Sequence, residues 1–233
     1  MPATAQVPDI PDGSHAPALP DPPAFSALPI TPLAIHAVEY ARACESESVA
    51  NHSIRSYLFA ALVAEHEGLR PSADFDPDLL FVACVLHDLG TSPQAGGTQR
   101  FEVDGADLAA AFLTDHGAGA ADVDLVWEAI ALHTSPGIAE RRGTLAYLTR
   151  SGIGVDFGRG AQFVTDAQAR AIHARHPRLR MAAALVDEIL RHAARGPQNA
   201  PPFSLAAQLL REQGQDGRPT SLERAAQASR WGE

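Results

Sequence analysis

The sequence contains no lysine, because all 18 of its basic residues are arginine in a chain of 233 residues. This excludes reactions that need a lysine Schiff base, and phosphate-binding loops that need a lysine. The formal net charge is −10 and the arginines are dispersed, so the clustered cations that nucleic-acid phosphates require are missing. We therefore expect no nucleic-acid partner.

Cysteine is scarce, and long apolar runs are missing. The only cysteines are Cys44 and Cys84, which form no CxxC pair and no disulfide-rich pattern, so we expect buried thiols in a reducing compartment. No run of about 18 uncharged apolar residues occurs, and the N-terminus has no basic segment followed by an apolar one. We predict a cytoplasmic protein with no membrane partner.

Proline is distributed unevenly along the chain. Half of the 18 prolines lie in residues 1–32, and proline both fixes φ and removes an amide donor. We expect an extended proline-rich arm over 1–32, one helical domain over 33–195, and a tail over 196–233 with short helices at 203–212 and 220–230. The hydrophobic content of 45% is ordinary for a globular protein with a single core.

Helix start signals and a helical apolar period predict an all-α fold. Thr31–Pro32 and Asp76–Pro77 each join an N-cap residue to a first-turn proline. Sustained alternation between hairpin turns is missing, so we expect no strands. The predicted helices cover 32–44, 48–67, 77–90, 103–116, 122–134, 143–155, 166–175 and 177–194.

Histidine and aspartate recur in four separate segments: His52, the pair His87–Asp88, His133 and Asp156. Mixed imidazole and carboxylate ligands suit zinc, iron or manganese. His87 and Asp88 would point about 100° apart on a regular helix, but the relaxed end of an apolar helix lets both converge. An acid buried there needs an opposing charge, which a metal supplies. Taken singly, an aspartate such as Asp156 is more often a helix cap or surface acid, and a histidine such as His133 more often a satisfied core histidine.

Together these segments resemble the HD-domain superfamily of metal-dependent hydrolases, in which a histidine, a His–Asp pair and a later aspartate come from separate helices. The resemblance implies an HD-type helical bundle with His52, His87, Asp88 and Asp156 as metal ligands. It covers about residues 33–190. The segments 52–57, 87–91 and 100–106 are similar to the cyanamide hydratase branch.

The number of metal ions depends on two further positions. Two-metal members of the superfamily usually have two more histidines, the first shortly before a Gly–Ala pair. Here Phe101 stands at that place before Gly105–Ala106, whereas His133 matches the second histidine. We expect one divalent ion, with zinc preferred over iron or manganese, although Glu102 or His116 would allow a second site.

The resemblance implies a hydratase that adds metal-activated water to cyanamide, giving urea, or to a related small nitrile-like substrate. His133 and Asp88 form the predicted catalytic set, in which His133 orients the substrate or moves a proton. The residues expected around the substrate or behind the ligands are Arg55, Thr91, Phe101, Glu102 and Thr134. We also allow for a homo-oligomer.

Three alternatives stay open at this point. An HD-type phosphohydrolase acting on a nucleotide or another phosphomonoester needs several convergent cations, and only Arg55 and Arg100 lie near the predicted site. A dinuclear iron oxygenase is disfavoured by Phe101, and a non-catalytic helical scaffold by the intact ligand set. The pocket volume separates the hydratase from a phosphohydrolase that acts on a nucleotide, because a cavity for a few heavy atoms excludes nucleotides.

Overall fold

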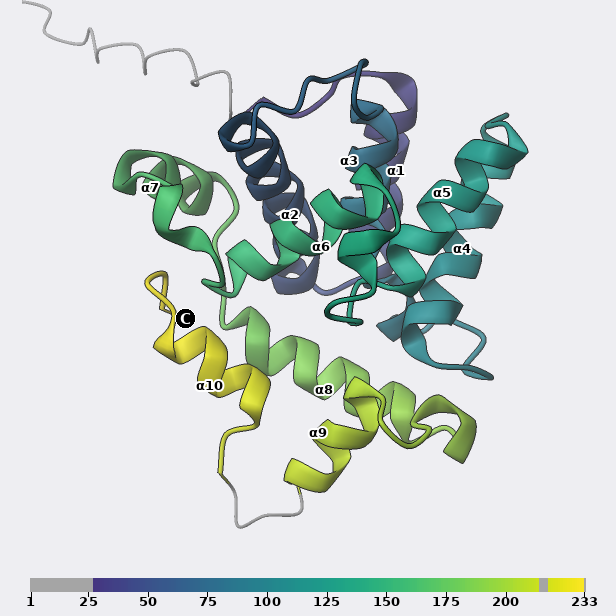
Figure 1. Ribbon diagram of the computed structural model, residues 1–233. Coiled ribbons are helices and arrows are strands. Elements are labelled where there is room, and N and C mark those ends of the chain that lie inside the picture. Colours follow the sequence, from purple (N-terminus) through teal and green to yellow (C-terminus); the bar gives the residue numbers. More distant parts are fainter. Residues whose placement is uncertain (1–26, 214–217, 233) are drawn as a thin grey trace, which may run out of the picture.

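The computed structural model describes residues 27–213 and 218–232, and this part of the chain is helical (Figure 1). Four 3-10 turns join the helices: η2 (Leu89–Thr91), η3 (Ala139–Arg141), η4 (Ala161–Phe163) and η5 (Pro197–Asn199). The α-helices are α1 (Pro32–Cys44), α2 (Glu47–His66), α3 (Pro77–Val85), α4 (Phe101–Asp115), α5 (Ala120–Ala131), α6 (Thr144–Asp156), α7 (Asp166–Arg175), α8 (Met181–Ala193), α9 (Leu205–Gln213) and α10 (Ser221–Ala228).

The all-α prediction is confirmed, since the described residues hold no strand beyond one isolated bridge between Pro71 and Phe75. The predicted helix starts have the expected caps. Thr31 Oγ1 accepts a hydrogen bond from the Ala34 amide at 3.3 Å, and Asp76 Oδ1 accepts from the amides of Asp78 and Leu79. Most of the predicted proline-rich arm, residues 1–26, lies outside the described residues.

Helices α2 and α6 cross at the centre of the bundle, with α1, α3, α4 and α5 around them (Figure 1). Their backbones approach closely at Gly152 of α6, where an added Cβ would lie 2.1 Å from the Ser56 carbonyl oxygen of α2. Nearly every residue of α2 from Ser48 to Ala60 is buried. Polar side chains on α2 are therefore held in the interior.

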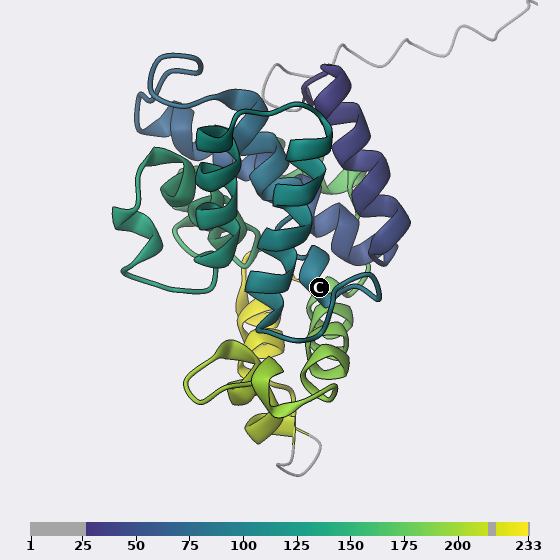
Figure 2. The same ribbon diagram turned by 90° about the vertical axis from the view of Figure 1, so that its right-hand side faces the viewer.

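The C-terminal helices α8, α9 and α10 form a separate group beside the bundle, as both ribbon views show (Figures 1 and 2). They bury a second apolar cluster that includes Leu185, Ile189 and Leu209 together with Phe101 and Ile153 of the bundle. Polar anchors add to this packing, since the Trp231 Nε1–H donates to the Val155 carbonyl at 2.7 Å. The described part of the tail therefore packs against the bundle.

Both cysteines are unpaired. Cys84 is fully buried in the main core, and burial raises the pKa of its thiol. A search of the described helices for a segment long and apolar enough to span a bilayer finds none.

Candidate metal centre

The predicted ligands come from three irregular or central positions of the bundle. His52 lies in α2, His87 and Asp88 lie in the turn between α3 and η2, and Asp156 ends α6. His133, the predicted catalytic residue, lies in the turn after α5. Helix α3 ends at Val85, before the predicted end at residue 90. The His–Asp pair therefore leaves helical geometry, which allows two consecutive side chains to point into one site.

The turn that follows the pair is fixed by close backbone packing. An added Cβ on Gly90 would lie 1.8 Å from the carbonyl oxygen of Phe101, and one on Gly105 would lie 2.9 Å from the Gly90 amide nitrogen. Only glycine permits η2 to approach α4 so closely. This contact holds the backbone of the His–Asp turn in place.

The three histidine rings surround the Asp88 carboxylate. His87 Nε2 lies 3.1 Å and His52 Nε2 3.8 Å from Asp88 Oδ2, while His133 Nε2 lies 3.8 Å from the other oxygen, Oδ1. All four side chains are almost completely buried. We call this set of four residues the metal wall.

Each histidine of the metal wall has its other ring nitrogen bound to a fixed acceptor. The Nδ1–H of His87 donates to the Cys84 carbonyl and that of His133 to the Ile130 carbonyl, both at 2.7 Å. A carbonyl can only accept, so Nδ1 carries the proton and Nε2 of the neutral ring keeps its lone pair. Such anchoring orients metal-binding imidazoles and sets their tautomer.

The residues of the wall fit a divalent cation. His52, His87 and Asp88 each offer a ligand atom within 4.8 Å of the others, and among the described residues they are the only such group. His52 Nε2 and Asp88 Oδ2 are buried without a hydrogen-bond partner, which is costly unless another group satisfies them. A bound metal ion would satisfy both atoms.

The electrostatics of the wall favour the protonation states that bind metals. Burial raises the pKa of Asp88, but the neighbouring His87 and His52 outweigh it and hold the pKa well below its ordinary value. Burial, with the nearby charge of His87, lowers the pKa of His133 to about 4. Burial also lowers the pKa of His52. Burial opposes the charged form of His87, but the Asp88 carboxylate outweighs it and raises the pKa of His87. The wall thus offers a carboxylate together with His52 and His133 as neutral imidazoles near pH 7.

The structure does not bring Asp156, the fourth expected ligand, into this group. Its Oδ2 accepts from His52 Nδ1–H at 2.6 Å and from Arg55 Nη2 at 2.8 Å, and its Oδ1 accepts from Arg55 Nε at 2.8 Å and from Arg178 Nη1 at 3.0 Å. Although burial opposes ionisation, the charge of Arg55 keeps the pKa of Asp156 well below its ordinary value. Both oxygens already have partners, so Asp156 orients His52 from behind.

Arg55 supports the wall through this carboxylate. Its side chain is fully buried, grips Asp156 with two nitrogens, and also donates through Nη1 to the carbonyls of His176 and Pro177. Two-nitrogen contacts of this kind are strong and fix the plane of the carboxylate. The arginine is thereby committed to structure and is not available to a substrate.

The remaining predicted residues divide between the cavity and its surroundings. Phe101 and Thr134 border the cavity in front of the wall, whereas Thr91 and Glu102 do not. The Thr91 hydroxyl donates to the Asp88 carbonyl at 2.9 Å and approaches Glu188. Glu102 accepts from the Thr134 hydroxyl at 2.5 Å and from Arg100 at 2.7 Å, so it positions Thr134 instead of contacting a substrate.

The cavity in front of the metal wall has a volume of about 150 Å³. Four aliphatic side chains of the C-terminal helices also border it, and we call them the roof: Leu185, Ile189, Leu205 and Leu222. Phe101, Ile153 and Phe157 complete the apolar lining. Sequence reasoning missed the roof, because its residues have an ordinary amphipathic pattern and lie far along the chain from the ligands.

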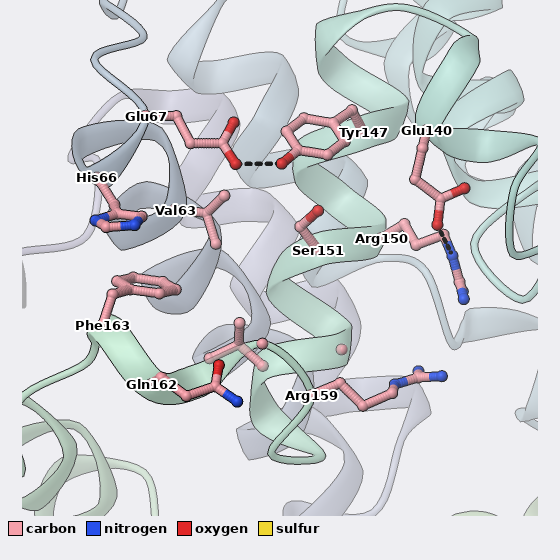
Figure 3. Close-up of a pocket in the computed structure, with 13 residues that line it drawn as sticks. Val63, His66, Glu67, Glu140, Tyr147, Arg150, Ser151, Arg159, Gln162 and Phe163 are labelled. Carbon is pink, nitrogen blue, oxygen red and sulfur yellow. Dashed lines mark hydrogen bonds and ion pairs between the residues drawn. The ribbon is translucent and has the colours of Figure 1, made fainter.

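Two arginines that the sequence analysis did not select, Arg150 and Arg159, also border the cavity. They border in addition an outer groove of about 750 Å³ on the far side of α6, which includes His66 and Phe163 (Figure 3). In Figure 3 the side chains of Arg150 and Arg159 both point to the right, away from His66 and Phe163. Arg150 is committed to Glu140 at 2.8 Å and to the His133 carbonyl at 2.6 Å.

Neither residue considered for a second ion joins the wall. His116 Nε2 lies 3.1 Å from His36 Nδ1 beside a different hollow, between α1 and the end of α4. Glu102 is held by Arg100 and Thr134. The geometry of the described residues therefore supports one ion at the wall.

The comparisons with known proteins agree with this geometry. A family model of the HD domain matches residues 49–212, more than half of the chain, and this range holds the metal wall together with Asp156. A search of curated proteins for relatives found no match. The matched family and the His52–His87–Asp88 group together indicate a metal site. The chain belongs to the HD domain family of metal-dependent hydrolases.

Proposed function

We propose that the protein is a metal-dependent hydratase that adds water to cyanamide, giving urea, or to a related small nitrile-like substrate. The observation that supports this proposal most is the metal wall. Its His52 Nε2 and Asp88 Oδ2 have no hydrogen-bond partner, and it borders a cavity of only about 150 Å³. In this proposal His52, His87 and Asp88 hold one divalent ion, with zinc preferred over iron or manganese.

A bound divalent ion lowers the pKa of water and polarises a substrate that it contacts. The side chains of the wall supply the rest of the chemistry. Hydration of a nitrile forms a C–O bond and moves both protons of water to nitrogen. His133 is neutral near pH 7 and directs Nε2 toward Asp88, so it can take a proton from water and return it to the nitrile nitrogen.

The size of the cavity supports a small substrate. Pockets for drug-sized ligands have volumes of about 300–1,000 Å³, so a cavity of about 150 Å³ is too small for a nucleotide. Apart from the wall and the two arginines Arg150 and Arg159, the side chains that border the cavity are uncharged, which also fits a neutral molecule. Cyanamide and short nitriles meet both conditions.

A phosphomonoester is the second candidate substrate, and Arg159 is the observation that favours it. Arg159 borders both the cavity and the outer groove (Figure 3). Arg55 and Arg150 face carboxylates and carbonyls of the protein, so phosphate would have one nearby arginine where several usually converge. We therefore rank phosphate esters second, after nitriles.

The decisive experiment is a substrate panel with protein loaded with one equivalent of Zn²⁺. Cyanamide, acetonitrile and a set of phosphomonoesters are incubated separately, and urea, amide and free phosphate are measured. We expect urea from cyanamide, and we expect His87→Ala and Asp88→Ala to lose both the bound zinc and the activity. His36→Ala, a histidine outside the wall, is the matched control and keeps both. Phosphate release without urea would overturn the proposal.

His133 is tested separately, because its role differs from that of the ligands. We expect His133→Ala to keep stoichiometric metal and to lose turnover by about 100-fold or more, the usual contribution of general acid–base catalysis. Metal content by elemental analysis and kcat are measured on the same samples. Loss of the metal in this variant would instead make His133 a ligand.

A further inference from the structure

The roof is as much a part of the cavity as the metal wall, although it comes from a segment remote in sequence. Leu185 and Ile189 come from α8, Leu205 is the first residue of α9, and Leu222 lies in the first turn of α10. Figures 1 and 2 both show these helices grouped on one side of the bundle. The C-terminal helices therefore close the space in front of the metal ligands.

The two sides of the cavity differ completely in chemistry. The wall presents imidazole and carboxylate groups, whereas every cavity residue from the C-terminal helices is aliphatic. A bound molecule that places a polar carbon–nitrogen group at the wall has leucine and isoleucine side chains of the roof available to its other end. An apolar substituent is favoured there, and a charged one would lose its hydration without a partner.

We propose that Leu205 and Leu222 set the substrate's upper size limit, and that the substrate class is a small uncharged nitrile or cyanamide with a short apolar substituent. This rests on the proposed function. Beyond that function, it identifies which residues select the substrate and which end of the substrate they contact.

The four roof residues are not equivalent. Leu185 and Ile189 are buried members of the second apolar cluster, so their truncation would also weaken the attachment of α8. Leu205 and Leu222 pack against the edge of that cluster and are only partly buried. The capping box between Thr220 and Glu223 fixes the start of α10, which holds Leu222 in place. Truncating either leucine should enlarge the cavity while leaving the fold intact.

The test uses a ladder of linear aliphatic nitriles beside cyanamide, with zinc-loaded wild type, Leu205→Ala, Leu222→Ala and Leu222→Phe. We expect the alanine variants to accept nitriles one or two carbons longer. For the first homologue that wild type rejects, kcat/KM should rise about tenfold or more, because apolar pockets discriminate one methylene by roughly 10–200-fold. Leu222→Phe should shorten the ladder and keep cyanamide as a substrate.

A second readout needs no turnover. Calorimetric binding of N-alkylureas, homologues of the expected product, should show the same shift in the longest chain accepted. Leu210→Ala is the matched control, since Leu210 is on α9 but does not border the cavity and is 39% exposed. If wild type hydrates no nitrile, the proposed function fails, while the urea ladder still decides the size limit.

Two results would overturn the inference. One is a ladder that is unchanged in both alanine variants, or shifted equally in Leu210→Ala. The other is a wild-type preference for the anion cyanoacetate over propionitrile that disappears in Arg159→Gln, because selection would then lie with the arginine and not with the roof.

Discussion

The metal wall and the roof border one cavity, but different forces hold them in place. The wall consists of buried polar groups, and each of its histidines has a fixed partner at Nδ1, such as Asp156 for His52 and the Cys84 carbonyl for His87. The roof consists of aliphatic side chains packed in or against the second apolar cluster. Directional bonds fix the wall, and shape and burial fix the roof.

This difference has consequences for what each region tolerates. Removing one member of a buried polar network leaves its partners charged or unsatisfied, which costs several kcal/mol. Trimming a partly buried leucine mainly removes apolar contact, which costs about 0.8 kcal/mol for each buried CH₂ that is lost. We infer that the wall fixes the chemistry of the site, whereas the roof is the region that tolerates substitution.

The largest effect should come from Asp156→Asn, which breaks the support of the wall. Arg55 would stay buried without its carboxylate, and leaving such a charge uncompensated costs about 3–5 kcal/mol. His52 would lose its charged acceptor, and changes to such supporting groups weaken metal binding by about 10–100-fold. Urea unfolding and metal titration measure the two effects, with the stoichiometry staying at one ion.

A matched control for that substitution is Asp166→Asn, which breaks the exposed ion pair with Arg230. Exposed pairs contribute little, so this variant should change neither quantity appreciably. If Asp156→Asn folded normally and bound no metal at all, Asp156 would be a direct ligand, as the family resemblance first implied. Unchanged affinity would refute both roles.

A smaller effect should appear in the pH dependence of the metal-free protein. Burial, together with the charge of Arg55, lowers the pKa of His176 to about 4, whereas an exposed histidine has a pKa of about 6.5. As pH falls from about 6.5 to 4, the unfolded chain binds a proton at this histidine, whereas the folded chain does not. Stability from this residue is therefore complete above about pH 6.5 and is lost toward pH 4.

Between pH 7 and pH 5 this residue should lower the free energy of unfolding by roughly 2 kcal/mol. His176→Asn removes the titrating ring while keeping the backbone carbonyl that accepts from Arg55. The comparison is urea unfolding of both proteins at the two pH values. A drop of the same size in the variant would show that other groups, such as the buried histidines of the wall, account for it.

The wall was largely predictable from sequence, for reasons that are local. Thr31 and Asp76 mark helix starts through their own caps. The His87–Asp88 pair marks a site because an acid at the end of an apolar helix needs a partner. The end of α3 differed, as did the place of Asp156: the chain leaves helical geometry at Leu86 because close packing of Gly90 on α4 requires another path.

The rest of the site depends on contacts between remote segments, which local patterns do not encode. Arg55 and Asp156 are separated by 101 residues in sequence, and no local pattern around either one indicates which carboxylate meets the arginine. The same holds for Arg150, whose nitrogen reaches the His133 carbonyl. Leu205 and Leu222 read as ordinary helix residues. Their place in the cavity follows only from how α9 and α10 pack.

The smallest effect should come from Trp231→Phe, which weakens the attachment of the roof segment. The variant keeps an aromatic ring against Phe59 and loses the hydrogen bond from Nε1 to the Val155 carbonyl. One such bond contributes about 1 kcal/mol. Urea unfolding should show this loss, and limited proteolysis should cut the C-terminal helices faster.

Metal affinity in the same variant tests whether the two regions are independent. Val155 directly precedes Asp156, so a disturbance of its carbonyl could reach the wall through the backbone. We expect none, because Arg55 and Arg178 hold the Asp156 carboxylate from other elements. An unchanged metal affinity beside faster cleavage would show that the roof loosens without the wall. A parallel loss of affinity would show instead that the C-terminal helices help to hold the ligands.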